Sequence, residues 1–325
     1  MAKERKKVNK KKVVKVVLIS LAVFIVLNLI GAAVGTSTSI THPSRESYDE
    51  IIKFTKDNKM WGDFDSYEKK DYTVKGVDGY ELGCMSVTVP ENKGTGRYVI
   101  MSHGHKNNKY GCVKFCAPYI ELGFTCIIYD QRAHGNNAKA ICSMGGTEAK
   151  DLNYLIEDTI NRFGDVDILG LQGESMGSST SLNALRYTDK VDFIVADCGF
   201  ESLRYMVHDM YNDMYLYPFG TCADIGFKLI YNIDTSEVSG IDALKDKNVP
   251  ILFIHGESDD WIDVENSKDM YAEAQKYAYT ELWLVPGAGH GRSRYVAGKD
   301  AYRDHISSFL EKAGITGESS QAAAA

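Results

Sequence analysis

The chain has 325 residues, of which 44% are hydrophobic, enough to build the core of one enzyme-sized domain. Its formal charge is −7, but the first 15 residues carry eight lysines and arginines against one acid, which leaves −14 for residues 16–325. Since the phosphate backbone of nucleic acids repels an acidic surface, this balance argues against nucleic acid as a partner.

The N-terminal segment has the pattern of a membrane anchor. Residues 1–15 are basic, and residues 16–34 carry no charge. A helix of 19 residues spans about 28 Å, close to the thickness of the hydrocarbon core of a bilayer. We therefore expect a transmembrane signal-anchor at residues 16–35, with the basic residues in the cytoplasm and the rest of the chain outside the membrane. The alternative is a secretory signal peptide cut near Ala33-Val34-Gly35, which would give a secreted protein.

Seven cysteines form an odd set without a Cys-x-x-Cys pair. We interpret them as small buried apolar residues with free thiols.

The residues after the anchor predict a lead-in segment followed by a β-hairpin. Residues 36–71 mix apolar and charged positions at helical spacing, which indicates one or two amphipathic helices. Asp78-Gly79 then lies between two strand-like runs and is a strong hairpin signal. The sheet is therefore expected to open with antiparallel strands.

From Arg97 onward, strand-like and helix-like segments alternate. This alternation predicts an α/β fold with a mostly parallel, doubly wound sheet, whose active residues gather at the carboxyl ends of the strands. The expected strands are residues 98–102, 124–129, 168–172, 193–196, 251–254 and 281–285, and the expected helices are residues 109–121, 147–163, 176–187, 264–278 and 299–312.

One long segment interrupts the alternation. Residues 200–247 are rich in tyrosine and methionine, and they predict a helical cap insertion whose apolar side chains either pack between helices or line a substrate pocket. Residues 314–325 predict a disordered tail.

The pentapeptide Gly173-Glu174-Ser175-Met176-Gly177 joins an apolar strand to a helix. Such a turn lifts a serine above the sheet edge in a strained conformation, and its flanking positions leave no room for side chains. The plain alternative is a glycine-rich connection with an ordinary serine. We expect Ser175 to be a nucleophile.

A nucleophilic serine needs a base, and the base needs an acid to hold its tautomer. His290 lies in a glycine-rich loop directly after the strand that ends at Val285, which is where the catalytic base is expected. The acid is expected from the loop after residues 251–254, with Asp259 as the first candidate and Asp260 as its rival. His255 is expected to be structural. Two further acids of this loop would cap a helix or face solvent: Glu257 and Asp263.

An oxyanion hole requires two backbone N–H donors. Met176 supplies one by its position after the serine, and His105 is the expected source of the other. The pair His103 and His105 also suggests a metal site, but Lys106 and Asn107 follow where a metallohydrolase would place further ligands. We expect no metal. The turn Asp130-Gln131-Arg132 is interpreted as structural, with its charged side chains pairing or capping backbone groups.

Taken together, these motifs give residues 72–313 a strong resemblance to the α/β-hydrolase superfamily. The chain is similar to bacterial membrane-anchored cell-surface hydrolases and to the Bem46-like and serine aminopeptidase or monoglyceride-lipase-like groups. The resemblance implies a catalytic triad of Ser175, Asp259 and His290, with no metal or organic cofactor. Asp263 stands where relatives often have a proline. The motifs that carry the resemblance are His103-Gly104, Asp130-x-Arg132-x-His134-Gly135, Gly173-x-Ser175-x-Gly177, His255-Gly256-x-x-Asp259 and Gly289-His290-Gly291.

The expected function is hydrolysis of a carboxylic ester, acyl or lipid-like, through an acyl-enzyme, as in carboxylesterases and lipases. A serine at the turn argues against the epoxide hydrolases and haloalkane dehalogenases, which use an aspartate there.

Two alternatives stay open. One is a serine peptidase of the aminopeptidase type, with Glu174, Glu201 or Asp209 holding a free amino terminus, and the other is a non-catalytic binding domain. The expected partners are a small ester or acyl substrate and a membrane, and not nucleic acid.

Overall fold

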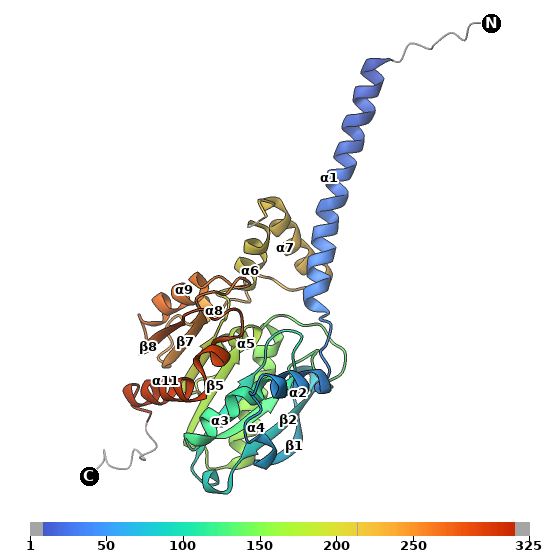
Figure 1. Ribbon diagram of the computed structural model, residues 1–325. Helices are drawn as coiled ribbons and strands as arrows, with labels where there is room; N and C mark the ends of the chain where they lie inside the picture. The colour runs from blue at the N-terminus through green and yellow to red at the C-terminus, as the bar shows by residue number, and fades with distance from the viewer. Residues whose placement is uncertain (1–8, 213, 316–325) are drawn as a thin grey trace, which may run out of the picture. The chain divides into compact units, whose positions relative to one another are not determined.

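The computed structural model describes residues 9–212 and 214–315, and its centre is one eight-stranded sheet (Figure 1). The predicted strands at residues 98–102, 124–129 and 168–172 are all present, with ends shifted by at most two residues. In chain order the strands are β1 (Glu68–Lys75), β2 (Glu81–Thr88), β3 (Arg97–Ser102), β4 (Thr125–Tyr129), β5 (Ile168–Glu174), β6 (Phe193–Asp197), β7 (Ile251–Gly256) and β8 (Thr280–Val285).

The strand order confirms the mostly parallel, doubly wound sheet. It runs β1-β2-β4-β3-β5-β6-β7-β8. The pairs β1/β2 and β2/β4 are antiparallel, and every pair from β4/β3 to β7/β8 is parallel. The predicted hairpin at Asp78-Gly79 joins β1 to β2, and both residues have positive φ. β3 and β5 therefore lie at the centre of the sheet, which places the ends of these strands away from its edges.

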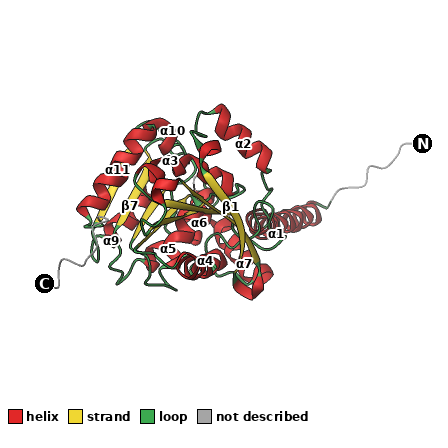
Figure 2. Ribbon diagram, turned by 90° about the horizontal axis from the view of Figure 1, so that it is seen from below, coloured by secondary structure: helices red, strands yellow, loops and turns green. Residues whose placement is uncertain are grey.

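Helices cover both faces of the sheet (Figure 2). The predicted helices at residues 147–163 and 299–312 have the expected bounds. The α-helices are α1 (Lys10–Thr41), α2 (Tyr48–Asp57), α3 (Val113–Glu121), α4 (Thr147–Phe163), α5 (Met176–Ala184), α6 (Leu203–Asn212), α7 (Tyr217–Tyr231), α8 (Gly240–Ala243), α9 (Glu265–Ala274), α10 (Ser293–Ala297) and α11 (Lys299–Lys312).

Two hydrophobic cores follow from the alternation of side chains along the strands. On one face, Val99 and Met101 of β3 pack with α3 and α11. On the other face, Tyr98 and Ile100 of the same strand pack with α4 and α5. Because successive residues of a strand point to opposite faces, a central apolar strand serves both cores.

The described chain divides into two compact units. The larger unit comprises residues 40–206 and 235–315, and it contains the whole sheet. The second unit comprises residues 9–39 and 207–234, which are most of α1, the end of α6 and α7. The predicted cap segment, residues 200–247, is helical as expected and is shared between the two units.

The helix α1 is long and apolar enough to cross a membrane, and its apolar part is exposed. These properties are compatible with a membrane anchor or with a signal sequence. The helix continues beyond the predicted span to Thr41 because its polar last turns contact α7 (Figure 1). The hydroxyl groups of Thr38 and Tyr231 lie 2.8 Å apart, and those of Thr36 and Tyr211 are also hydrogen-bonded.

The segment between α1 and the sheet contains one α-helix, α2, which agrees with the one or two expected. α2 begins with a capping box, in which the Ser47 and Glu50 side chains each accept a backbone N–H of the other residue. β1 begins at Glu68, before the expected start of the sheet at Tyr72. Most of the predicted tail, residues 316–325, lies outside the described residues, as do residues 1–8.

Candidate active site

Ser175 occupies a strained turn between β5 and α5. Its φ of 55° and ψ of −119° lie outside the regions that side-chain-bearing residues normally adopt. A Cβ atom at Gly173 would collide with the carbonyl group of Gly177, and one at Gly177 would collide with the carbonyl group of Ser102. The two glycines therefore allow the turn to pack closely against β3, and Ser175 lies at the tip of the turn.

The structure brings the three residues of the predicted triad into one hydrogen-bonded chain. The Oγ atom of Ser175 lies 2.9 Å from Nε2 of His290, and Nδ1 of His290 lies 2.8 Å from Oδ2 of Asp259. A carboxylate accepts the Nδ1 proton, so Nε2 carries the lone pair that faces the serine. Ser175, Asp259 and His290 follow strands β5, β7 and β8, at the carboxyl edge of the sheet.

The loop after β7 separates Asp259 from Asp260. The Asp259 side chain is fully buried, and its Oδ1 accepts the N–H groups of Trp261 at 2.9 Å and Ile262 at 3.0 Å. Asp260 is exposed. The loop therefore fixes Asp259 in place with one carboxylate oxygen directed at His290.

His255 is a second imidazole beside Asp259. Its Nε2 lies 3.2 Å from Oδ2 of Asp259 and 2.9 Å from the carbonyl oxygen of Ile262, and its Nδ1 lies 2.6 Å from Oγ of Ser267. This buried ring contacts the same carboxylate oxygen as His290, in line with the structural role expected for it.

Burial and hydrogen bonding shift the pKa values of Asp259 and His290 in opposite directions. Burial by itself raises the pKa of Asp259, but hydrogen bonds from His255 and His290 outweigh it and hold that pKa well below its usual range. Burial lowers the pKa of His290, but its hydrogen bond to Asp259 and the charge of that carboxylate raise the pKa above the ordinary value. Asp259 is therefore a carboxylate at neutral pH, and His290 is more basic than a free imidazole.

Both residues of the predicted oxyanion hole lie next to Ser175. Met176 is the first residue of α5, where backbone N–H groups have no partner inside the helix. His105 follows Gly104, at which a Cβ atom would lie 3.5 Å from that of Ser175. Their role as donors stays a prediction.

Trp261 lies at the site and was not predicted as one of its residues. Its ring stacks on His290 with a centroid distance of 6.1 Å, and 67% of its surface is exposed. An aromatic residue two positions after the candidate acid was the available signal. The ring offers an apolar surface beside the candidate base.

A buried ion pair lies behind the nucleophile turn and was also not predicted. Lys114 of α3 pairs with Glu174, and its Nζ donates to the carbonyl oxygen of Gly291 at 3.3 Å. The turn at Ser175 and the loop of His290 are thus held by one ammonium group. Asp197 adds a third tie, since its backbone carbonyl accepts the Ser175 N–H at 2.9 Å.

The charged side chains of the turn after β4 contact backbone groups, which is one of the two expected alternatives. Arg132 pairs with Asp151 of α4, at 2.7 and 2.8 Å, and not with Asp130. Asp130 instead accepts the N–H of Lys109 at 2.8 Å. The turn is structural, as expected, but the partner of the arginine lies on a helix that the local sequence does not identify.

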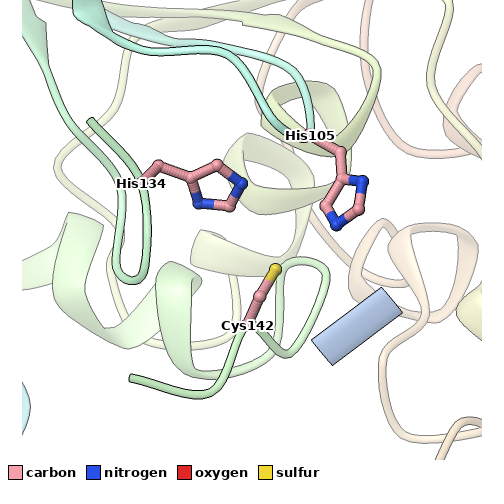
Figure 3. A group of neighbouring side chains, drawn as sticks. All are labelled: His105, His134 and Cys142. Carbon is pink, nitrogen blue, oxygen red and sulfur yellow. The ribbon is translucent and has the colours of Figure 1, made fainter. Parts of the chain in front are cut away.

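A cluster of possible metal ligands lies in the larger unit. His105, His134 and Cys142 each offer one ligand atom within 4.8 Å of the others, and Figure 3 shows the two rings and the sulfur facing a common space. Nδ1 of His134 donates to a backbone carbonyl at 2.8 Å, and its buried Nε2 has no hydrogen-bond partner among the described residues. Nε2 of His105, however, lies 2.9 Å from the carbonyl oxygen of Ile40.

The hydrogen bonds that these ring nitrogens already make limit the cluster as a metal site. A carbonyl oxygen requires a proton on Nε2 of His105, so that atom offers no lone pair to an ion. His103 is not available either, because its Nδ1 donates to Gly104 and its Nε2 accepts the N–H of Gln131 at 3.0 Å. On the His105 ring only Nδ1 then keeps a lone pair, so the cluster would hold an ion only through Nδ1 of His105 together with Nε2 of His134 and a deprotonated Cys142.

Comparisons with known proteins agree with this geometry. The family model described as alpha/beta hydrolase fold matches residues 98–221. The chain is 28% identical over 295 residues to the uncharacterized protein YqkD of Bacillus subtilis (strain 168), which covers 88% of this chain and 94% of YqkD.

Two solved structures resemble the chain in fold. The Pyrococcus furiosus esterase Pf2001 has a TM-score of 0.61 and 20% identity, over 79% of this chain and 95% of the esterase. An acylaminoacyl peptidase of Pyrococcus horikoshii has a TM-score of 0.60 and 16% identity, over 76% of this chain and 42% of the peptidase. At these identities the likeness shows a shared fold.

Proposed function

We propose that the chain is a serine hydrolase of the α/β-hydrolase fold that cleaves a carboxylic ester through an acyl-enzyme, in keeping with the family model that matches residues 98–221. Ser175 is the nucleophile, His290 the general base and Asp259 the acid that orients the base. The observation that carries this proposal is the continuous chain of hydrogen bonds from Ser175 through His290 to Asp259, at 2.9 and 2.8 Å.

Acylation follows from these contacts. Nε2 of His290 takes the Ser175 proton as Oγ attacks the ester carbonyl carbon, and Asp259 stabilises the imidazolium that forms. The N–H groups of Met176 and His105 hold the oxyanion of the tetrahedral intermediate. When that intermediate collapses, His290 returns the proton to the departing alkoxide, and the acyl group stays on Ser175.

Deacylation repeats the same steps with water. His290 takes a proton from water as its oxygen attacks the acyl carbon, and the proton then passes to Oγ of Ser175 as the acid leaves. The raised pKa of His290 makes it a stronger base, which favours proton transfer from the Ser175 hydroxyl group and from water.

Two observations favour an ester over a peptide. An aminopeptidase needs a free carboxylate to hold the substrate amino terminus, but Glu174 is already paired with Lys114. Burial raises the pKa of Glu201, which makes that residue a weaker anion. The exposed ring of Trp261 beside His290 instead offers an apolar contact for an acyl chain.

We further propose that α1 anchors the protein in the cell membrane. The lysines and arginines of residues 1–15 favour a cytoplasmic N-terminus, and residues 40–206 and 235–315, which we call the hydrolase unit, would then lie on the other side of the membrane. Cleavage near Ala33-Val34-Gly35 is the alternative, in which α1 serves as a signal sequence.

The test is hydrolysis of p-nitrophenyl esters of increasing acyl length by the full chain in detergent, with Ser175→Ala as the variant. Loss of the serine is expected to reduce kcat by about 10⁴-fold or more, since removing a triad nucleophile leaves only binding and oxyanion stabilisation. A fluorophosphonate probe should label the parent chain and not the variant.

Ser178 provides the matched control, because it is a buried serine three residues away that is not part of the hydrogen-bonded chain. Ser178→Ala should keep both labelling and turnover. Equal turnover by Ser175→Ala and the parent chain, or no labelling of the parent, would remove the proposed function.

A further inference from the structure

Exposed apolar side chains cover the α6–α7 hairpin, which we define as residues 207–234. Tyr215 and Leu229 are about four-fifths exposed, at 81% and 80%. Exposed apolar clusters of this kind mark surfaces that contact a protein, a ligand or a membrane. The other large exposed residues of the hairpin are Met210, Met214, Leu216, Tyr217, Ile225 and Ile230.

The hairpin packs directly on α1 within one compact unit. A Cβ atom at Gly226 would collide with the carbonyl group of Ala33, so the two helices touch at the backbone there. Five residues further along each helix, Tyr231 contacts Thr38. The equal spacing shows that α7 runs parallel to α1. Close contact through a small residue is how helices pack inside membranes.

The contact continues into the apolar part of α1. A groove is lined by Phe24, Leu27 and Ala32 of α1 together with Leu216 and Phe219 of the hairpin. At 1.5 Å per residue, Phe24 lies about 12 Å and Ala32 about 24 Å along the helix from residue 16, where the apolar run begins. Both values fall within a hydrocarbon core of about 30 Å. Hairpin residues that contact α1 here lie at the same depth.

The charges of the hairpin agree with that depth. Residues 214–223 contain no charged side chain. His208 and Asp224 pair at 2.7 Å, and Lys228 pairs with Asp234 at 3.2 Å, which lowers the cost of placing them near lipid. By its spacing from Gly226, Lys228 lies level with Gly35, where the apolar run has ended.

We propose that the α6–α7 hairpin is a second membrane element, embedded beside α1 in the leaflet farther from the basic N-terminus, with its exposed face covered by lipid acyl chains. The proposal rests on the membrane anchorage by α1 that is part of the proposed function. Tyr211 and Tyr231 suit this location, because they contact Thr36 and Thr38 beyond the apolar run, and tyrosine rings are enriched where hydrocarbon meets the headgroups.

The test places a fluorescent label at single positions of the full chain in vesicles of phosphatidylcholine and phosphatidylglycerol. Cys222 is replaced by alanine first, because the other six cysteines are buried and will not react. An environment-sensitive label is then attached at Tyr215→Cys or Leu229→Cys. Leu21→Cys in α1 reports on the anchor, and Lys276→Cys, an exposed position of the hydrolase unit, is the matched control.

Lipids with a nitroxide near the headgroup end of the acyl chain should quench the label at position 229, and lipids with a nitroxide deeper in the chain the label at position 215, each several-fold more than the label at position 276. Aqueous iodide should show the reverse order. Iodide quenching at 215 and 229 equal to that at 276 overturns the proposal, and so does shielding from both quenchers, which would indicate a protein partner on this face.

The label at position 21 separates the two hypotheses. Quenching by lipid at 21 but not at 215 and 229 keeps the anchor and rejects the hairpin insertion. Quenching at 215 and 229 without quenching at 21 rejects the anchor and supports insertion of the hairpin alone. No lipid quenching at any of the three rejects both.

Discussion

Asp197 and Asp259 are two carboxylates at the same edge of the sheet, and they differ in nearly every other respect. Asp197 ends β6, and Asp259 follows the neighbouring strand β7. Asp259 faces two imidazoles, and its pKa is held well below its usual range. Asp197 accepts from the hydroxyl groups of Ser293 at 3.0 Å and Tyr302 at 3.2 Å, and burial raises its pKa to about 6.

The difference shows that the end of a strand positions a carboxylate, while partners from distant segments set its pKa and its role. A hydroxyl group stabilises a carboxylate less than an imidazolium does, and the negative charge of Glu174 further raises the pKa of Asp197. Asp259 is thus suited to orient a base, and Asp197 to hold the turn of Ser175 through its backbone. The predictions below separate the two roles.

The largest effect is expected from Asp259→Asn. An amide has no charge to stabilise the imidazolium, and it favours the wrong tautomer of His290, so kcat should fall by about 10⁴-fold. Ester turnover measures this change. Asp260→Asn is the matched control and should stay within a few-fold of the parent, because Asp260 is exposed. A larger loss in Asp260→Asn would assign the acid to Asp260.

Lys114→Met should cost the hydrolase unit about 3–5 kcal/mol of stability, because it leaves Glu174 buried without its cation. Denaturant titration followed by tryptophan fluorescence measures it, since the three tryptophans of the chain all lie in this unit. The double variant Lys114→Met with Glu174→Gln should regain a large part of the loss. A double variant as unstable as the single one would contradict the ion-pair explanation.

Asp197→Asn should change how stability depends on pH. The pKa of Asp197 is raised to about 6 from 3.8, so its protonation stabilises the folded state below pH 3.8, and this contribution disappears as the pH rises through 6. The shift corresponds to about 3 kcal/mol between pH 4 and 7. Asparagine cannot titrate, so the stability difference between variant and parent should change by this amount across that range. A constant difference would show that Asp197 does not titrate there.

The smallest effect is the pH dependence of the parent chain itself. His290 must be neutral to accept the Ser175 proton, and its pKa is raised by Asp259. We expect kcat/KM to fall about tenfold per pH unit on the acid side, with a midpoint above the ordinary value of 6.5. A midpoint below that value would mean that burial outweighs the carboxylate.

Local sequence predicted the elements that have a clear period or a turn signal. The strand at residues 168–172, the helix at residues 147–163 and the Asp78-Gly79 hairpin are such cases, because alternation, helical spacing and glycine are all visible within a few residues. The placement of Ser175 at a strand-to-helix turn belongs with them, since two glycines mark it.

Other features depend on contacts between distant residues. The preference for Asp259 over Asp260 is a matter of side-chain direction, which the Trp261 and Ile262 N–H groups set. Arg132 pairs with a residue 19 positions away, and Lys114 with one 60 positions away. No local period encodes such pairs. The association of α7 with α1 is of the same kind.

The division into two units affects how the protein can be released from a membrane. The chain crosses between the units three times, after residues 39, 206 and 234. A signal peptidase cutting near Ala33-Val34-Gly35 would sever only the first connection. The hairpin would stay joined to the hydrolase unit at both of its ends and, if embedded, would keep the processed enzyme on the lipid. Shedding the hydrolase unit as a soluble product would then require a cut on each side of the hairpin.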